Sequence, residues 1–289
     1  MSNTDLIIEE RSRDIGDFLV GRLIPFRKKR MVGPFIFIDH MGPSTIKKDH
    51  YLDIGQHPHI GLSTLTYLFE GEIEHRDTLG TKQRVEPGGV GWMTSGKGIV
   101  HTERTPQDLR DGREFNMHGY QIWVALPKSQ EQMDPQFSYT EPDQLPVWEE
   151  GGLQFKLVAG KGYEKESPVP VFSELFMVDV RSQKRSTLNI KGQVKGEVGV
   201  CIVKGSIKAC SESIGAGNML VSKEEDICQI VLEENTHILI FGGEPFPEER
   251  KIFWNFVSSD QELIESAKAN WQDKNFEMMK DDESYIPLP

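Results

Sequence analysis

The sequence predicts an all-β protein made of two antiparallel β-domains in tandem, with a helix near the carboxyl end. Short alternating or apolar runs, broken by glycine and proline, recur through the 289 residues and give the β-prediction. A partial repeat of the first half within the second half gives the tandem arrangement. A capping motif followed by apolar residues at helical spacing gives the helix.

In the first half of the chain, strands are expected where apolar residues alternate or cluster between turn residues. The clearest strand contains Tyr120, Ile122 and Val124, which share one face and therefore belong to a core. The expected strands are residues 35–38, 62–69, 71–76, 90–94 and 119–126.

The segment that begins at residue 127 and ends near residue 150 is expected to connect two domains. It is polar and contains Pro127, Pro135, Pro142 and Pro146, so few of its residues can enter a core. Strands are expected again at residues 153–158, 174–180, 197–208 and 237–241. We therefore place an amino-terminal domain at residues 1–135 and a carboxyl-terminal domain at residues 136–289.

The helix is expected to begin after Ser259, because residues 259–262 have the Ser-x-x-Glu pattern of a capping box. Apolar residues at helical spacing follow and predict a face that packs on a β-domain. These residues are Leu263, Ile264, Ala267 and Trp271.

The composition excludes some classes of function. With 33 basic and 45 acidic residues, the net charge is −12, which repels phosphates and argues against direct nucleic-acid binding. No apolar run approaches the roughly 20 residues that span a bilayer, and the amino terminus lacks the blocks of a signal peptide. We therefore expect a cytoplasmic protein, or in a eukaryote also a nuclear one, with no membrane partner. The 3 cysteines, Cys201, Cys210 and Cys228, are an odd number and are expected to be free thiols.

Two short motifs supply a candidate metal site, His57-Pro58-His59 and His101-Thr102-Glu103. Residues i and i+2 of a strand point to the same face, so each motif can aim two donors at one point. The alternative is that these histidines merely decorate a strand and a turn. It is less favoured, because a glycine-rich turn before His101 lets its strand return beside the first one. Nitrogen and oxygen donors suit divalent iron, nickel, copper, manganese or zinc, and four protein ligands leave room for water or substrate.

The internal repeat places one such site in the amino-terminal domain. The residue types around Gly71 recur around Gly205, and a later glycine turn recurs as well. Counting back from Gly205, the positions that correspond to the first two histidines hold Lys191 and Gln193. This pair cannot form a second metal site of the same kind.

Longer motifs resemble the pirin family of the cupin superfamily. The motifs are Gly33-Pro-Phe-Ile-Phe-Ile-Asp-His-Met-Gly-Pro43, His57-Pro-His-Ile-Gly-Leu62, Pro87-Gly-Gly-Val90 and Met93-Thr-Ser-Gly-Lys-Gly-Ile-Val-His-Thr-Glu103. The resemblance implies two cupin-type antiparallel β-barrels, a bicupin, with one iron, Fe(II), in the amino-terminal barrel. It implies that the metal ligands are His57, His59, His101 and Glu103, and all four are intact in this sequence.

For activity, the resemblance implies either of two roles. One is a quercetin 2,3-dioxygenase, which opens a flavonol ring with O₂ and releases carbon monoxide. Glu103 would then act as a metal ligand, as the base for the flavonol 3-hydroxyl, or as both in turn. The other is a transcriptional co-regulator that acts through protein partners and uses its metal to stabilise the barrel or to sense redox state. We favour the enzyme. A non-redox cupin such as a sugar isomerase is less favoured, because the sequence shows no phosphate-binding cluster.

Three other histidines of the amino-terminal domain are expected to have structural roles. His40 follows a predicted strand and is expected to cap a turn. His75 and His118 have no partner at metal-ligand spacing.

Overall fold

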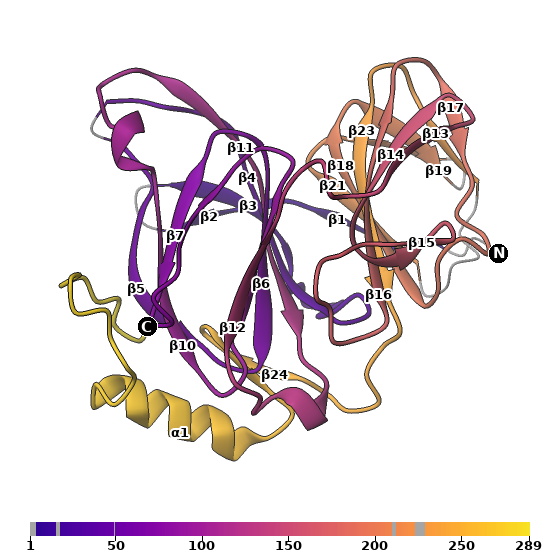
Figure 1. The fold of residues 1–289 in the computed structure, drawn as a ribbon. Helices are drawn as coiled ribbons and strands as arrows, with labels where there is room; N and C mark the ends of the chain where they lie inside the picture. Colours follow the sequence, from indigo (N-terminus) through magenta and orange to yellow (C-terminus); the bar gives the residue numbers. More distant parts are fainter. Residues whose placement is uncertain (1–3, 16–17, 49, 210–211, 223–228) are drawn as a thin grey trace. The chain divides into compact units, whose positions relative to one another are not determined.

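The computed structural model describes residues 4–15, 18–48, 50–209, 212–222 and 229–289, and strands dominate them (Figure 1). The strands pair antiparallel in their sheets, and one α-helix lies near the carboxyl end. The predicted all-β class with a terminal helix is therefore confirmed.

Contacts between residues group the chain into two compact units whose segments interleave. The histidine unit, which contains the predicted metal ligands, comprises Ser12–Val20, Ile38–Pro142 and Pro247–Pro289. The second unit comprises Met1–Arg11, Gly21–Phe37 and Asp143–Phe246. The expected domains, residues 1–135 and 136–289, are each continuous. Each compact unit instead combines three segments, so that the first residues of the chain group with the second half and the last residues group with the histidine unit. The physical reason is long-range pairing, since β1 (Thr4–Glu9) joins β21 (Asn218–Ser222) of the second half.

Most of the histidine unit is formed by strands of two sheets and a two-stranded hairpin, although residues 11, 21–24 and 35–37 of the larger sheet are grouped with the second unit. The seven-stranded sheet has the order β12 (Gln136–Thr140), β9 (Val90–Thr94), β6 (Leu62–Glu70), β11 (Phe115–Ala125), β4 (Phe35–Ile46), β3 (Leu19–Ile24) and β2 (Arg11–Asp14). The four-stranded sheet has the order β5 (Asp53–His59), β10 (Ile99–Arg104), β7 (Ile73–Asp77) and β8 (Lys82–Val85). The hairpin pairs β24 (Lys251–Phe253) with β25 (Phe256–Ser258), and the loops contain the short 3-10 helices Gln107–Leu109 and Lys128–Gln130.

The second unit repeats this two-sheet design. Its larger sheet has the order β1, β21, β18 (Glu197–Lys204), β23 (His237–Gly243), β16 (Leu175–Ser182), β14 (Leu153–Gly162) and β13 (Val147–Glu150), with β15 (Lys165–Glu166) paired to β14. Its smaller sheet has the order β17 (Ser186–Leu188), β22 (Ile230–Leu232), β19 (Ser206–Ala209) and β20 (Glu212–Gly215). Its core is apolar, and Lys191 and Gln193 lie in a turn outside that core. The predicted connection at residues 127–150 contains β12 and β13, so it is more ordered than expected.

The repeat predicted from the sequence is visible in the backbone. Gly71 follows β6 and Gly205 follows β18, with φ of +79° and +77°, and each turns the chain toward the smaller sheet of its unit. A Cβ atom would lie 2.7 Å from the Asn116 carbonyl oxygen at Gly71, and 2.5 Å from Thr236 Oγ1 at Gly205. Both turns therefore require glycine. The single strand expected at residues 197–208 is consequently split at Gly205 into β18 and β19.

The predicted helix is present as α1 (Gln261–Gln272), but its cap is displaced by one residue. Asp260 is the N-cap, and its carboxylate accepts a hydrogen bond from the backbone N–H of Glu262. Ser259, the expected cap, instead donates its N–H and its hydroxyl to Glu131. The buried residues of the helix are Ile264, Ala267 and Trp271.

Two further expectations concern membranes and thiols. Among the described residues, no helix is long and apolar enough to cross a membrane. Cys201 is a buried free thiol, as expected, whereas Cys210 and Cys228 lie outside the described residues.

Candidate metal centre

Strands β5 and β10 bring the predicted histidines together. They pair antiparallel, with His101 directly opposite His57 and Ile99 opposite His59. Directly opposite residues point to the same face of a sheet, and alternation along β5 puts His59 on the face that carries His57. The three imidazoles therefore share one face.

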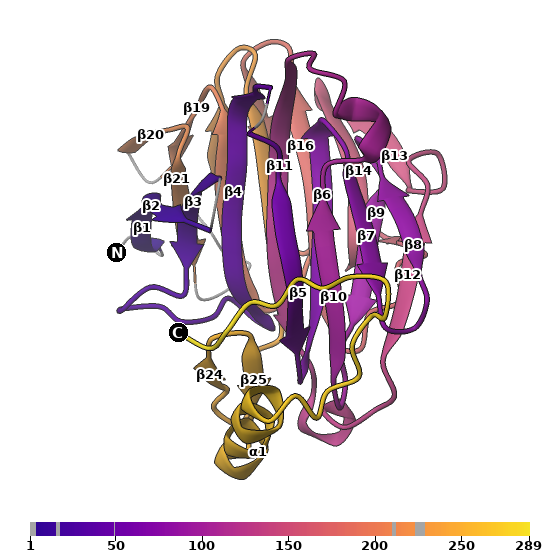
Figure 2. The same cartoon turned by 90° about the vertical axis from the view of Figure 1, so that its left-hand side faces the viewer.

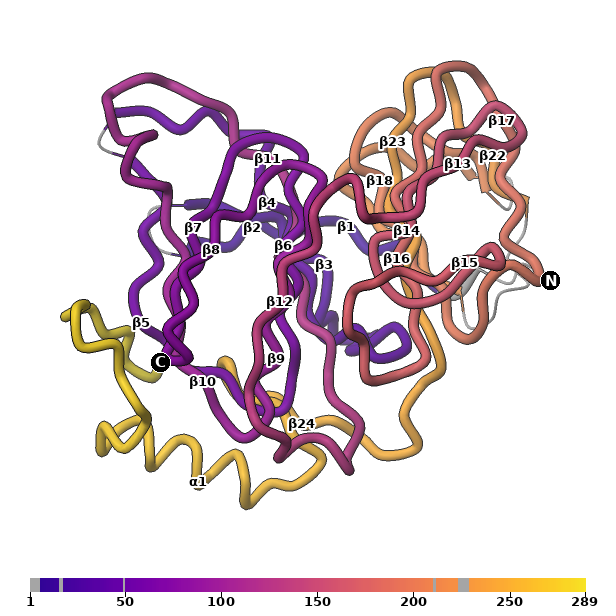
Figure 3. The backbone as a smooth tube through the Cα atoms, in the orientation of Figure 1, coloured from indigo at the N-terminus to yellow at the C-terminus, as the bar shows by residue number. Residues whose placement is uncertain are grey.

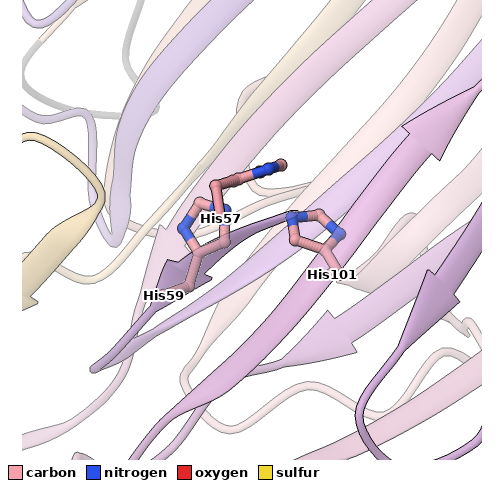
Figure 4. A group of neighbouring side chains, drawn as sticks. All are labelled: His57, His59 and His101. Carbon is pink, nitrogen blue, oxygen red and sulfur yellow. The ribbon is translucent and has the colours of Figure 1, made fainter. Parts of the chain in front are cut away.

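The three rings lie close enough to share one ion. Figure 4 shows His57, His59 and His101 gathered at one point. The ring centroids are 4.3 Å apart for His57 and His101, 5.0 Å for His59 and His101, and 5.1 Å for His57 and His59. One nitrogen of each ring lies within 4.8 Å of the others, and all three side chains are buried. Imidazole nitrogens arranged in this way can hold a divalent metal.

Glu103, the expected fourth ligand, does not join this group of three. The register between β5 and β10 shifts between His101 and Glu103, so Glu103 lies opposite Ile54 instead of Gly55. Its side chain is nevertheless buried, and its Oε1 lies 3.4 Å from the hydroxyl of Thr66. The structure thus brings together three of the four predicted ligands and places the fourth in a neighbouring polar group.

Burial controls the ionisation of all four predicted ligands. It lowers the pKa of His57 to about 4, and together with nearby imidazoles it lowers the pKa of His59 and of His101 well below the usual value. The rings are therefore neutral at physiological pH, the form in which imidazole binds metals. Burial raises the pKa of the Glu103 carboxyl to about 7, so this group can gain or lose a proton near neutrality.

Hydrogen bonds determine which ring nitrogens are available to a metal. His57 Nδ1 donates to the Gly55 carbonyl oxygen over 2.8 Å, so His57 Nε2 carries the lone pair. His101 Nδ1 lies 3.3 Å from His75 Nδ1. Within the described part of the chain, His101 Nε2 and His59 Nδ1 are buried and have no hydrogen-bond partner. An unsatisfied buried polar atom costs about 1–3 kcal/mol, so a metal ligand role for His101 Nε2 would remove a penalty that the fold otherwise carries. The residues therefore fit a metal ion.

The structure corrects the expectation that His75 has no partner at metal-ligand spacing. His75 is buried on β7, which lies beside β10, and its Nε2 is 2.9 Å from Asp77 Oδ2. His75 and Asp77 have the same i, i+2 spacing as the two metal motifs. This spacing is the sequence signal that could have identified the pair. His40 and His118 pair with each other, with 2.9 Å between their Nε2 atoms, and are not members of the group of three.

The carboxyl-terminal segment covers the outer edge of β5. This strand is the last in its sheet, a position where Pro58, which has no N–H, is tolerated. Residues 279–286 run across β5 (Figure 2), and Figure 3 traces the same segment from the end of α1. The Ser284 hydroxyl accepts from the Gln56 N–H, and the Ile286 N–H donates to the Gln56 carbonyl. The strand that carries two of the three histidines is thus protected on its outer edge.

The chain is similar over almost its whole length to other proteins in sequence and in structure. The family model described as Pirin matches residues 18–124, and the model described as pirin C-terminal cupin domain matches residues 177–277. A pirin-like protein from Caulobacter vibrioides is 42% identical over 291 residues, 99% of each chain. A crystal structure of quercetin 2,3-dioxygenase from Acinetobacter baumannii is 35% identical with a TM-score of 0.88, and the match covers 98% of this chain and 94% of that one. A second structure of that name and organism is 22% identical with a TM-score of 0.85, covers 96% and 98%, and shares the fold.

Proposed function

This chain belongs to the pirin family, and on that premise we propose that it is a metal-dependent dioxygenase that opens the ring of a flavonol such as quercetin with O₂. The observation that carries the proposal is the group of three buried, neutral imidazoles at the junction of β5 and β10. The 35% identical structure named quercetin 2,3-dioxygenase supports the choice of substrate class. Because folds of this kind host many reactions, the site and not the fold must decide the function.

The proposed ion is Fe(II), held by His57, His59 and His101. A structural zinc site would usually recruit thiolates, and this group contains none. Three nitrogen donors leave open positions at which a substrate oxygen can bind, and a redox-active metal suits a reaction with O₂. A bound ion of this kind would act as a Lewis acid that lowers the pKa of the flavonol 3-hydroxyl.

We assign the proton of that hydroxyl to Glu103. Its raised pKa of about 7 leaves a substantial fraction ionised near neutral pH, while its conjugate acid stays strong enough to return the proton. Thr66 Oγ1 lies 3.4 Å from Glu103 Oε1 and 2.9 Å from Gln121 Oε1, so these side chains orient the carboxyl group. Glu103 is also the proposed fourth ligand, and its position outside the group of three supports the role of base more directly.

A buried aromatic side chain restricts water around the rings. The Trp123 ring lies edge-on to His59 at a centroid distance of 5.1 Å, and it is buried. A dry site strengthens the electrostatic contacts and protects an electron-rich flavonol anion from protonation by solvent.

In the overall reaction both oxygen atoms of O₂ enter the ring-opened ester, and one ring carbon leaves with its own oxygen as carbon monoxide.

Oxygen uptake tests the proposal. Full-length protein loaded with Fe(II) is mixed with quercetin, and O₂ consumption, carbon monoxide and bound iron are measured together. We expect uptake with release of carbon monoxide, lost in His101→Ala and retained in His50→Ala, which alters an exposed histidine. Absence of uptake with quercetin and other flavonols at full iron occupancy would refute the enzyme and turn attention to a protein-interaction role.

A further inference from the structure

Behind His101 lies a chain of buried polar side chains that ends at Asp77. Asp77 Oδ1 accepts hydrogen bonds from the backbone N–H groups of Leu79, at 2.9 Å, and Thr81, at 3.1 Å. These bonds fix the carboxylate in the turn that follows β7. Asp77 Oδ2 lies 2.9 Å from His75 Nε2. Since Oδ1 already serves two donors, Oδ2 is the oxygen that accepts from His75.

The direction of these hydrogen bonds propagates through His75. A neutral imidazole has one N–H donor and one lone pair, and the Asp77 carboxylate draws the donor to Nε2, so Nδ1 of His75 carries the lone pair. This Nδ1 faces His101 Nδ1 over 3.3 Å, and a hydrogen bond between them requires the proton to be on His101. Phe137 stacks on His75, with centroids 4.4 Å apart and planes at 21°, which holds the ring in this orientation.

We infer that Asp77 and His75 are positioning residues that hold the proton of His101 on Nδ1 and thereby present its Nε2 lone pair to the metal. The consequence for the metal rests on the proposed function, whereas the proton position is a property of the protein alone. His101 Nε2 is the buried nitrogen that lacks a partner among the described residues. The two residues do for His101 what the Gly55 carbonyl does for His57. Partners of this kind fix the tautomer and orientation of ligand imidazoles.

Asp77→Asn tests the inference because it reverses the hydrogen-bond polarity at one atom. The amide oxygen must replace Oδ1 beneath the N–H groups of Leu79 and Thr81, which leaves the amide NH₂ facing His75. His75 must then accept at Nε2 and donate from Nδ1, so the proton of His101 moves to Nε2. His75→Phe interrupts the chain without changing the turn. His75→Gln is the matched control, because its amide can donate to Asp77 and accept from His101.

The proton positions are measured in the metal-free, full-length protein with ¹⁵N-labelled histidine, by long-range ¹H–¹⁵N correlation NMR. Metal affinity is measured by titration with Co(II). We expect His101 to be protonated at Nδ1 in the wild type and in His75→Gln, and at Nε2 in Asp77→Asn. We expect Co(II) to bind about 10- to 100-fold more weakly to Asp77→Asn and His75→Phe, the usual range for loss of such a partner, and about as well as wild type to His75→Gln.

A proton on Nε2 of His101 in the wild type would overturn the inference. So would an Asp77→Asn protein with the wild-type proton position and Co(II) affinity. The proposed metal site fails by a different result, namely a wild-type protein that binds no Co(II), or one that binds it equally well after His57→Ala. In that case the NMR measurement still decides the role of Asp77 and His75.

Discussion

Replacing Gln56 with leucine tests whether one side chain holds the carboxyl-terminal segment on β5. The buried Gln56 side chain accepts from the Met279 N–H at 2.7 Å and donates to the Asp282 carbonyl at 2.6 Å. Gln56→Leu removes these two bonds, together with longer ones from the same amide to the carbonyls of Ser284, at 3.3 Å, and Met279, at 3.5 Å, and leaves their partners without them. A bond whose loss leaves a buried partner unsatisfied costs about 1–3 kcal/mol, and because water can reach part of this segment we expect about 2–4 kcal/mol in total.

Native-state hydrogen exchange at the Ile286 amide measures this loss. That N–H donates to the Gln56 backbone carbonyl at 3.0 Å, a bond that the substitution itself leaves in place. If the free energy needed to detach the segment falls by about 2–4 kcal/mol, this amide exchanges about 30- to 1000-fold faster. The control is Gln83→Leu, which alters a half-buried glutamine bonded to the adjacent Arg84 carbonyl and is expected to leave this amide unchanged. Exchange within about threefold of wild type in Gln56→Leu would refute the reasoning.

Two further predictions concern buried charge in the histidine unit. Arg250 is buried, and its Nε lies 3.1 Å from Glu131 Oε1, so Arg250→Met leaves a buried carboxylate without its cation. We expect this substitution to lower the free energy of unfolding, measured in urea, by about 3–5 kcal/mol. The control is Arg113→Met at an exposed site, which should lower it by less than about 0.5 kcal/mol. For Glu103, the folded pKa of about 7 exceeds the ordinary 4.5, so the stability from this group is complete below pH 4.5 and is lost as the pH rises through about 7. Across that range the metal-free wild type should lose about 3 kcal/mol relative to Glu103→Gln, and parallel stability profiles would contradict the raised pKa.

The three histidines could be predicted from the sequence because the relevant geometry is local. Alternation along a strand fixes the common face of His57 and His59, and only a chain reversal is needed to bring His101 beside them. The repeat was predictable for a similar reason, since Gly71 and Gly205 each occupy a backbone conformation that glycine tolerates best.

The features that were not predicted depend on how distant strands align. A register shift of one residue moves Glu103 opposite Ile54, and no local pattern encodes that shift. His75 meets His101 because β7 pairs with β10, which its own flanking sequence does not reveal. The grouping of the first residues of the chain with its second half depends on pairing between strands far apart in the sequence, such as that of β1 with β21.

The central claim is that His57, His59 and His101 hold one metal ion. Its most direct test is an anomalous-difference map, recorded at the iron edge, from crystals of the full-length protein loaded with Fe(II) in the absence of oxygen. We predict one strong peak about 2 Å from Nε2 of His57, Nε2 of His101 and one ring nitrogen of His59, a distance typical of imidazole–metal bonds. Absence of a peak at the three histidines, or a peak that persists there in His57→Ala and His101→Ala crystals, would contradict the claim.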